Sequence, residues 1–314
     1  MFRKSLFFVF ILSASFLKLF PALACESCSC SLSRAGSDPL YLSDRVFFDF
    51  TQEGVNWNTR PAEEAHALHH QGHHVHNKTH EEFYHFSLGV NVNPDVTLLA
   101  EFPYMVRSST EVDSHATLGK REVSEGLGDA KLSTVWRFWR DHGNFLGALA
   151  GIKAPTGSTD ELNSQGVVFE PELQPGSGST DATVGAVFQW APGLVVVHGN
   201  VLYAFRTEGA YDFENGDLFS IYVSFDRVMN PDARDWHVTL GADLNWQSEG
   251  KQTDDGHRVA DSRGQTLLLG PSLKIQANDH LAFLGNILLP VSQNLDGVHQ
   301  ELDFIWNAST KISW

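Results

Sequence analysis

"ELDFIWNASTKISW", residues 301–314, decides the fold, because its side chains alternate between two kinds over the whole stretch. One set is mostly apolar and aromatic: Leu302, Phe304, Trp306, Ala308, Thr310, Ile312 and Trp314. The interleaved set is mostly polar: Glu301, Asp303, Ile305, Asn307, Ser309, Lys311 and Ser313. This period of two predicts a strand much longer than the roughly five or six residues of a typical soluble strand. A long strand with one apolar face is typical of an outer-membrane β-barrel.

The same alternation recurs along the chain. Residues 236–246 alternate apolar and polar side chains between two tryptophans, and residues 86–92 and 96–106 repeat the pattern. Aromatic residues at strand ends are typical of the girdles at the two membrane interfaces. The pattern predicts twelve strands, at about 45–55, 82–92, 96–108, 127–139, 144–154, 181–190, 194–207, 217–228, 235–248, 264–276, 280–290 and 300–314.

The connections between these strands alternate in length. Five are short and rich in Pro, Gly and Asn, at 93–95, 140–143, 191–193, 229–234 and 277–279. Six are longer, at 56–81, 109–126, 155–180, 208–216, 249–263 and 291–299. In an up-and-down barrel the short turns face the periplasm and the long loops face outside. We therefore predict an all-β fold, a transmembrane up-and-down antiparallel β-barrel of about twelve strands, in the outer membrane of a Gram-negative cell.

The first 24 residues have the features of a secretory signal peptide. Arg3 and Lys4 precede an apolar stretch, and Ala22 and Ala24 form a small-x-small cleavage site. A membrane helix is the alternative, but the stretch is too short to span a bilayer. We expect a signal peptide at 1–24 cleaved after Ala24, a Cys-rich periplasmic segment at 25–44, and the barrel at 45–314 with a His-rich extracellular loop at about 56–81.

The charge of the chain limits its partners. The full chain has a net charge of −16, so it has no general reason to bind nucleic acid, and we expect no such partner. The expected partners are outer-membrane lipid and either small solutes or metal ions. The sequence indicates no oligomeric state.

Three glycine-containing motifs lie at predicted strand ends. The segments "SEGLGDAKLSTVWRFW" (124–139), "GALAGIKAPTGSTDE" (147–161) and "LQPGSGSTD" (173–181) contain Gly126-Leu127-Gly128-Asp129, Lys153-Ala154-Pro155-Thr156-Gly157 and Gly176-Ser177-Gly178-Ser179-Thr180-Asp181. Together they resemble a family of outer-membrane transporters named for the meta-pathway of phenol degradation. The resemblance implies a barrel and the passage of small molecules, and it supplies no catalytic residues. The third motif lacks the lysine and strand–helix context of a phosphate-binding loop, so its glycines more simply permit left-handed backbone.

Residues 66–80, "HALHHQGHHVHNKTH", concentrate histidines in the first long connection. Together with the nearby His85 they give eight candidate metal ligands: His66, His69, His70, His73, His74, His76, His80 and His85. Imidazole is a common ligand of Zn, Cu and Ni, which are the candidate metals, although no cofactor is indicated with certainty. The alternatives are that these histidines form a merely solvated rim of the barrel, or a rim that responds to pH.

Cys25, Cys28 and Cys30 follow the predicted cleavage site. Their spacing supplies three soft thiolates, which suit Cu(I) or Zn. A disulfide between two of them, acylation of Cys25, or no role are the alternatives.

The alternation sends charged side chains into the barrel lumen. The candidate pore-lining residues are Glu101, Arg107, Lys131, Arg137, His198, Arg206, His237, Asp243, Lys274, Asp303 and Lys311. Charged lumen residues set the selectivity of an open pore, whereas in a narrow barrel they pair with one another and only stabilise it. A barrel of about twelve strands is compatible with both. On the same register, Leu240→Arg on the lipid face should destabilise the barrel more than Asp243→Asn in the lumen.

The sequence contains no Gly-x-Ser-x-Gly motif and no evident catalytic constellation, so we expect no enzyme. The first hypothesis is a channel or transporter for small solutes, with a link to divalent-metal traffic. A surface metal-binding protein with the barrel as its anchor is the second hypothesis. An outer-membrane hydrolase is the third.

Overall fold

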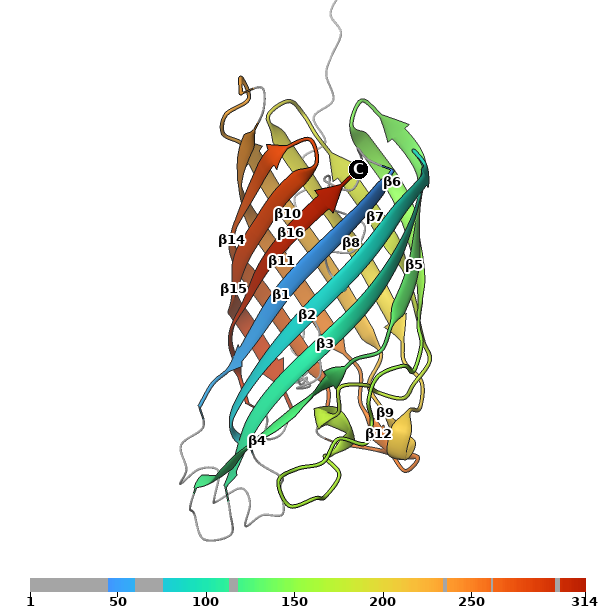
Figure 1. Ribbon diagram of the computed structural model, residues 1–314, viewed down its shortest axis with the longest axis vertical. Helices are drawn as coiled ribbons and strands as arrows, with labels where there is room; N and C mark the ends of the chain where they lie inside the picture. The colour runs from blue at the N-terminus through green and yellow to red at the C-terminus, as the bar shows by residue number, and fades with distance from the viewer. Residues whose placement is uncertain (1–44, 60–75, 113–117, 234–235, 261, 297–299) are drawn as a thin grey trace, which may run out of the picture.

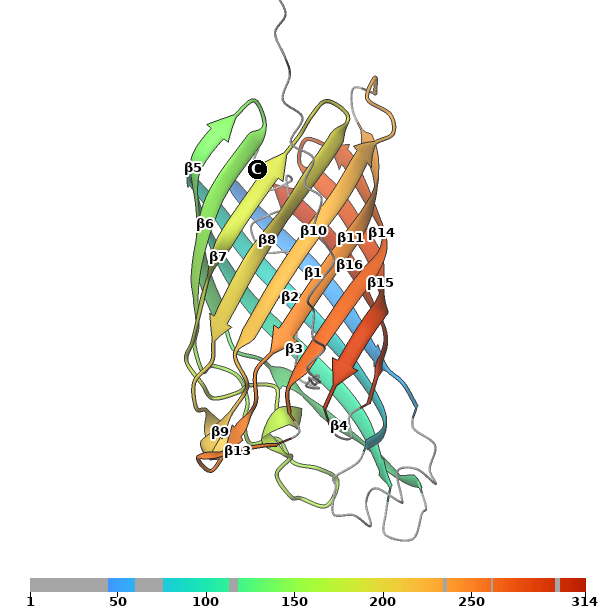
Figure 2. The same cartoon turned by 180° about the vertical axis from the view of Figure 1, so that it is seen from behind.

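The computed structural model describes residues 45–59, 76–112, 118–233, 236–260, 262–296 and 300–314. Twelve antiparallel strands form a sheet that closes on itself into a tall barrel with tilted strands (Figure 1). The strands follow one another around the wall in chain order, as the view from behind in Figure 2 also shows. The predicted fold class and strand number are confirmed.

The wall strands are β1 (Val46–Trp57), β2 (His76–Asn93), β3 (Val96–Val112), β5 (Lys131–Asp141), β6 (Asn144–Lys153), β7 (Asp181–Trp190), β8 (Val195–Phe205), β10 (Leu218–Val228), β11 (His237–Glu249), β14 (Gly264–Asn278), β15 (Leu281–Leu295) and β16 (Leu302–Ser313). The connections carry β4 (Leu118–Leu127), β9 (Phe213–Glu214), β12 (Thr253–Asp254), β13 (His257–Arg258) and the 3-10 helices η3 (Pro171–Leu173) and η4 (Ala210–Asp212). Within the described ranges, no helix is long and apolar enough to cross a membrane.

The barrel closes where β1 meets β16. Phe50 of β1 lies opposite Phe86 of β2 on one side and Thr310 of β16 on the other. At one end of this seam the N–H of Val46 donates to the carbonyl of Trp314 (3.1 Å), and the N–H of Trp314 donates back (2.9 Å). Each wall strand therefore has a hydrogen-bonded neighbour on both sides, as a strand that crosses a lipid bilayer requires.

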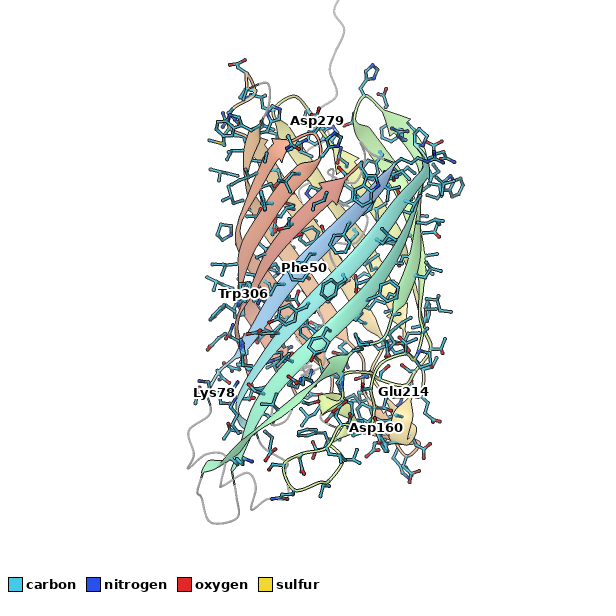
Figure 3. All side chains as sticks on the ribbon, viewed as in Figure 1. Phe50, Lys78, Asp160, Glu214, Asp279 and Trp306 are labelled. Atoms are coloured by element: carbon cyan, nitrogen blue, oxygen red, sulfur yellow. The ribbon has the colours of Figure 1, made fainter. Side chains whose placement is uncertain are left out.

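The two ends of the barrel differ in their connections. We call the end with the tight β2–β3, β5–β6, β7–β8, β10–β11 and β14–β15 turns the short-turn end, and the other the long-loop end. Asp279 lies at the short-turn end, whereas Asp160 and Glu214 lie at the long-loop end (Figure 3). The C-terminus lies at the short-turn end (Figure 1).

Side chains alternate between a polar interior and an apolar exterior. On β16, Asn307 and Lys311 are buried inside, whereas Ile312 is exposed outside. Phe50 and Trp306 project from the outer surface in Figure 3. Exposed tryptophans gather at the short-turn end: Trp136, Trp139, Trp190, Trp236 and Trp314. This distribution follows from the environment, since lipid favours an apolar outer face and interfacial aromatic girdles, while interior polar groups can hydrogen-bond to each other.

The expected 109–126 loop is largely a strand instead. β3 pairs with β5 only over Val96–Glu101, and from Tyr104 onward it pairs with β4. β3 therefore continues beyond the level at which β5 begins, and β4 covers the edge that would otherwise be unpaired. The 208–216 and 249–263 connections also contain short paired strands, which form a small sheet in the order β13-β12-β9.

Candidate functional site

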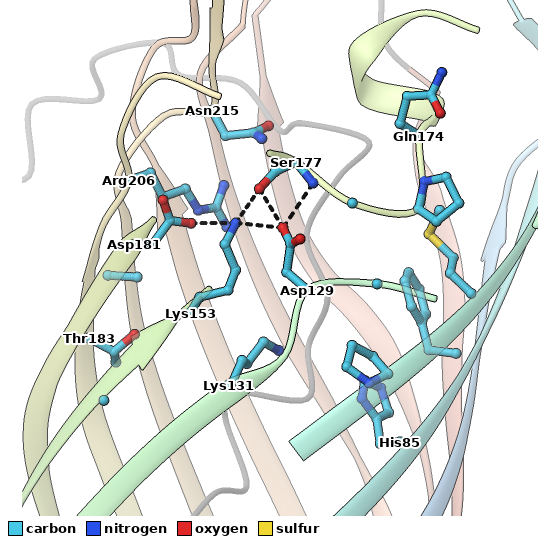
Figure 4. Close-up of a pocket in the computed structure, with 18 of the residues that line it drawn as sticks. His85, Asp129, Lys131, Lys153, Gln174, Ser177, Asp181, Thr183, Arg206 and Asn215 are labelled. Atoms are coloured by element: carbon cyan, nitrogen blue, oxygen red, sulfur yellow. Dashed lines mark hydrogen bonds and ion pairs between the residues drawn. The ribbon is translucent and has the colours of Figure 1, made fainter. Parts of the chain in front are cut away.

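The three glycine-containing motifs meet at the long-loop end of the barrel (Figure 4). The first motif precedes β5, the second follows β6, and the third leads into β7. β6 pairs with both β5 and β7, so the antiparallel register brings these three strand ends together. We call Asp129, Lys153, Asp181, Ser177 and Ser179 the motif cluster, because these side chains are in direct contact.

Asp129 joins both ends of the 155–180 connection. Its Oδ1 accepts a hydrogen bond from the N–H of Gly157 (2.9 Å). Its Oδ2 accepts hydrogen bonds from the N–H (2.9 Å) and the Oγ (2.6 Å) of Ser177. Hydrogen bonds to a carboxylate are about twice as strong as neutral ones, and here the carboxylate belongs to a buried residue. One side chain therefore closes the connection into a loop whose two ends lie side by side.

Lys153 lies between two carboxylates. Its Nζ is 2.6 Å from Oδ2 of Asp181 and 3.4 Å from Oδ2 of Asp129. It also donates to the hydroxyls of Ser177 (2.5 Å) and Ser179 (3.1 Å). The contacts of Lys153 therefore join the end of β6 to the start of β7 and to the motif that precedes β5.

Two further contacts hold the 155–180 connection against the wall. Arg107, on the inner face of β3, pairs with Glu81 (2.5 Å) and donates to the backbone carbonyl of Glu172. Glu122 of β4 accepts hydrogen bonds from the N–H (2.8 Å) and the Oγ of Ser164. These bonds to Ser164 hold the pKa of the Glu122 carboxyl below its usual value. The connection is thus fastened at its ends, at η3 and at its tip.

A cavity of about 150 Å³ lies between this connection and the inner wall (Figure 4). Its apolar lining includes Phe83, Pro103, Met105, Pro171, Pro175 and Ala204. Its polar lining includes His85, Arg107, Lys131, Gln174, Arg206 and the motif cluster except Ser179. An apolar cavity of about this volume accommodates a single benzene-sized ring. The cavity thus combines space for one ring with polar groups around it.

The charges around the cavity are paired. Lys131 lies 2.9 Å from Glu101, and Arg206 pairs with Glu249. His85 is 2 % exposed, with Nδ1 3.5 Å from Glu101, and its Nε2 has no hydrogen-bond partner among the described residues. A buried polar atom without a partner is costly unless water or a ligand contacts it. Nε2 of His85 is therefore a candidate contact for a bound solute.

The predicted pore-lining residues are found on the inner wall with one exception. Glu101, Arg107, Arg137, His198, Asp243, Lys274 and Lys311 are buried, and Lys131, Arg206 and His237 are partly buried. The prediction for Asp303 is wrong, because this residue is exposed. The β1–β16 pairing shifts register between Asn56 and Trp57, so Leu302, opposite Trp57, is buried in its place.

Two of the predicted metal ligands, His80 and His85, have described side chains, and they do not lie together. His80 and His85 lie on opposite faces of β2, because they are an odd number of residues apart in a strand. His80 is hydrogen-bonded to Asn56 (3.0 Å) and Glu82 (3.2 Å). His76 begins β2, and the other five candidate histidines and the three cysteines lie outside the described residues. Within the described part of the chain, no group of three or more His, Cys, Asp or Glu side chains could hold a metal ion.

Sequence reasoning missed Asp129, Ser177 and Asp181 as site residues, although all three lie in the quoted motifs. The sequence feature that pointed to them is an aspartate that follows Gly-x-Gly within three residues, at the start of two strands. Taken one at a time, these motifs indicate only turns. Their common role follows from strand pairing, which places the ends of β5, β6 and β7 in one corner of the mouth.

Residues 74–294 match a family model described as "Putative MetA-pathway of phenol degradation". Among solved structures, an outer membrane channel from Pseudomonas putida F1 is 15% identical, with a TM-score of 0.62 over 87% of this chain and 97% of that chain. The β domain of the Bordetella autotransporter BrkA is 10% identical, with a TM-score of 0.47 over 86% of this chain and 100% of that chain. No curated protein sequence matches this chain. At these identities the structural likenesses concern the barrel fold.

Proposed function

This chain belongs to the family described as the MetA-pathway of phenol degradation, and we propose that it is a passive outer-membrane channel for small solutes. The cavity beneath the 155–180 connection is the entry site in this proposal, and it is the observation that carries it. A solute that enters from the long-loop end meets this cavity before the rest of the lumen. The 155–180 connection then limits the size of what passes.

The paired charges and the volume of the cavity favour one class of solute. The cations Lys131, Lys153 and Arg107 each have a carboxylate partner, so an incoming anion would have to displace a buried ion pair. An uncharged molecule that donates or accepts a hydrogen bond meets no such cost. The volume suits one ring, and the family description names phenol degradation. We therefore infer that the solutes are small, uncharged, ring-containing molecules with a hydroxyl group.

The experiment that tests this proposal fills the cavity and compares the result with a matched change on the outer wall. Ala204 is buried and lines the cavity, whereas Ala242 is exposed on the lipid face of β11. Ala204→Phe should slow the entry of phenol into liposomes that contain the refolded full chain. Ala242→Phe should leave the rate unchanged, since an aromatic side chain is well tolerated against lipid.

Heat-dependent migration on a detergent gel would show whether each variant has formed a barrel. Glucose and benzoate would serve as comparison solutes that differ from phenol in polarity and charge. Equal phenol flux through wild type and a folded Ala204→Phe variant would contradict the role of the cavity. The absence of any flux above that of protein-free liposomes would contradict the channel itself.

Metal binding stays a separate prediction. The His-rich segment that motivates it lies largely outside the described residues, and the described cavity contains no group of ligands for a metal. A surface metal-binding protein is therefore retained only as the second hypothesis from the sequence.

A further inference from the structure

Arg137, on the inner face of β5 near the short-turn end, is a buried cation whose hydrogen-bond donors are only partly used. It is 2 % exposed, and its Nη1 donates to Oγ1 of Thr97 (2.9 Å). Its Nε and Nη2 are buried and have no hydrogen-bond partner among the described residues. A guanidinium group keeps its proton in proteins, so it cannot avoid the cost of burial by becoming neutral.

The carboxylates around Arg137 are engaged elsewhere. The carboxylate of Asp95, in the β2–β3 turn, pairs with the exposed Arg140 (3.3 Å), and only the backbone carbonyl of Asp95 accepts a hydrogen bond from the N–H of Arg137 (2.7 Å). Glu101, the buried carboxylate of the neighbouring strand β3, pairs with Lys131 at the far end of β5 (2.9 Å).

Arg137 differs in this from other cations of the inner wall. A carboxylate pairs with each of Arg107, Lys131, Lys153, Arg206 and Lys274. A buried charge without a counter-charge is costly, and a bound anion removes that cost. Arg137 is therefore a candidate contact for an anionic ligand.

The two unused donors of Arg137 lie on one edge of the guanidinium group. Nε–H and one N–H of Nη2 point in parallel directions, and such an edge donates two parallel hydrogen bonds to the oxygens of a carboxylate. Nη1, on the other side of the group, is already bound to Thr97. The part of the guanidinium group that is left for a ligand is therefore the part that recognises a planar pair of oxygens.

An apolar cluster lies beside Arg137. The guanidinium carbon of Arg137 is 5.4 Å from the centroid of the Phe145 ring. The buried apolar cluster to which this ring belongs consists of Val135, Phe145, Leu149, Val187 and Leu202. On β6, a Cβ at Gly147 would lie 3.3 Å from the Cα of Arg137 and 3.0 Å from Cγ2 of Val187. No side chain at this position of β6 therefore separates Arg137 from the cluster.

Gln189 of β7 adds a hydrogen-bond acceptor to the same wall. It lies opposite Phe145, and its Nε2 donates to the carbonyl of Gly143 (2.6 Å). Its Oε1 is buried and has no partner among the residues that the structure describes. An acceptor in this place repels a second carboxylate on a ligand, whereas it accepts a hydrogen bond from a hydroxyl group. The wall therefore favours a ligand with a single carboxylate.

We propose that Arg137 and the apolar cluster bind a small monocarboxylate with an aromatic body. The carboxylate accepts hydrogen bonds from Nε and Nη2, and the body of the ligand lies against the cluster. This site is separate from the cavity beneath the 155–180 connection, which lies at the long-loop end and which Arg137 does not line. The inference goes beyond the proposed channel function, because binding at this site requires no passage through the barrel.

The test is isothermal titration calorimetry of benzoate with the refolded full chain in detergent. Benzoate should bind the wild type saturably, and acetate, which lacks the aromatic body, should bind more weakly. Arg137→Met removes the charge and should weaken benzoate binding at least about tenfold. Arg137→Lys retains the charge without the paired donors, so it should recover only part of the affinity. Arg140→Met, at an exposed arginine of the same strand, is the matched control and should bind as the wild type does.

Urea titration provides a second readout and shows that each variant is folded. Benzoate should raise the stability of the wild type and of Arg140→Met more than that of Arg137→Met, because a ligand stabilises the folded state to which it binds. A wild type that does not bind benzoate, or a folded Arg137→Met variant that binds it as tightly as the wild type, would overturn the inference. Neither result bears on the proposed function, which the flux of phenol through the Ala204→Phe variant tests.

Discussion

The backbones of Gly157 and Gly176 pack directly against each other at the two ends of the 155–180 connection. A Cβ on Gly157 would lie 2.6 Å from the Cα of Gly176, and one on Gly176 would lie 2.5 Å from the carbonyl carbon of Gly157. Side-chain atoms do not approach backbone so closely, so neither position can accept another residue without a shift of the chain. The contact lets Asp129 bind both ends of the connection at once.

We predict that Gly176→Ala loosens the 155–180 connection and leaves the barrel intact. Forcing a methyl group into this contact should cost about 1–3 kcal/mol of local stability. Limited proteolysis of the refolded protein should therefore cut within 155–180 faster than in the wild type, while the heat-dependent gel shift is unchanged. Gly285→Ala is the matched control, because its new Cβ would meet only one atom, at 3.6 Å. Equal cleavage rates in the two variants would show that the Gly157–Gly176 contact does not hold the 155–180 connection in place.

We predict that the tip of the same connection loosens in acid. Hydrogen bonds from Ser164 hold the pKa of the Glu122 carboxyl below its usual value of 4.5. A lowered pKa means that the fastened state binds a proton less tightly than the free state does, so the contact is fully present above about 4.5 and is lost as the pH falls through the lower value. Hydrogen–deuterium exchange of the peptide around Ser164, corrected for the intrinsic effect of pH, measures this loss.

Glu122→Gln is the control for that measurement. The amide carries no charge and does not titrate, so the variant should show the weaker protection at neutral pH already and should not change on acidification. Protection that is pH-independent in the wild type would show that Glu122 does not fasten the tip.

We predict that Leu240→Arg and Asp243→Asn both destabilise the barrel, for different reasons. Leu240 is exposed on the lipid face, where an arginine costs about 2–4 kcal/mol at mid-membrane. Asp243 accepts hydrogen bonds from Ser224, Ser272 and Asn286, so an amide NH₂ at this position would face donors and cost about 1–3 kcal/mol. Urea titrations of folding into lipid vesicles measure both. A neutral Asp243→Asn would mean that the hydroxyls and amide simply reorient.

We predict that Zn binding at neutral pH depends on residues 66–75. Deleting this range should remove most of the bound metal, and binding by the full chain should fade below about pH 6.5, where protons compete for the imidazole nitrogens. Isothermal titration calorimetry measures both effects. His80→Asn and His85→Asn should each retain Zn binding, because these residues lie on opposite faces of β2. Undiminished binding by the deletion variant would assign the metal to another part of the chain.

The barrel itself could be predicted from the sequence, because a lipid-facing strand must alternate over its whole length. The predicted segment at 181–190 matches β7 in both bounds, and that at 144–154 matches β6 to within one residue. The sequence did not predict a strand within the 109–126 connection, because β4 pairs only with β3 beyond the barrel wall, where no lipid imposes an apolar face. Asp303 was misplaced because a register shift near Trp57 interrupts the strict period of two.

The candidate site was less predictable. Inward-pointing residues such as Lys131 and Lys274 follow from alternation alone, but their partners do not. Asp226 was not predicted to contact Lys274, because that contact crosses an entire strand and depends on the missing side chain of Gly241. Likewise, the joint role of Asp129 and Ser177 depends on two chain segments that come together only when the sheet has closed.

The seam between β1 and β16 has a consequence for biogenesis. Its cross-strand contacts include the pair Asp49 and Ser309, which are 260 residues apart in the chain. Until β16 has been synthesised and exported, β1 has no partner on that side, and the growing chain presents an open, aggregation-prone edge. So distant a contact also makes spontaneous folding slow. The open edge therefore persists until the last strand is available, and the docking of β16 onto β1 removes it.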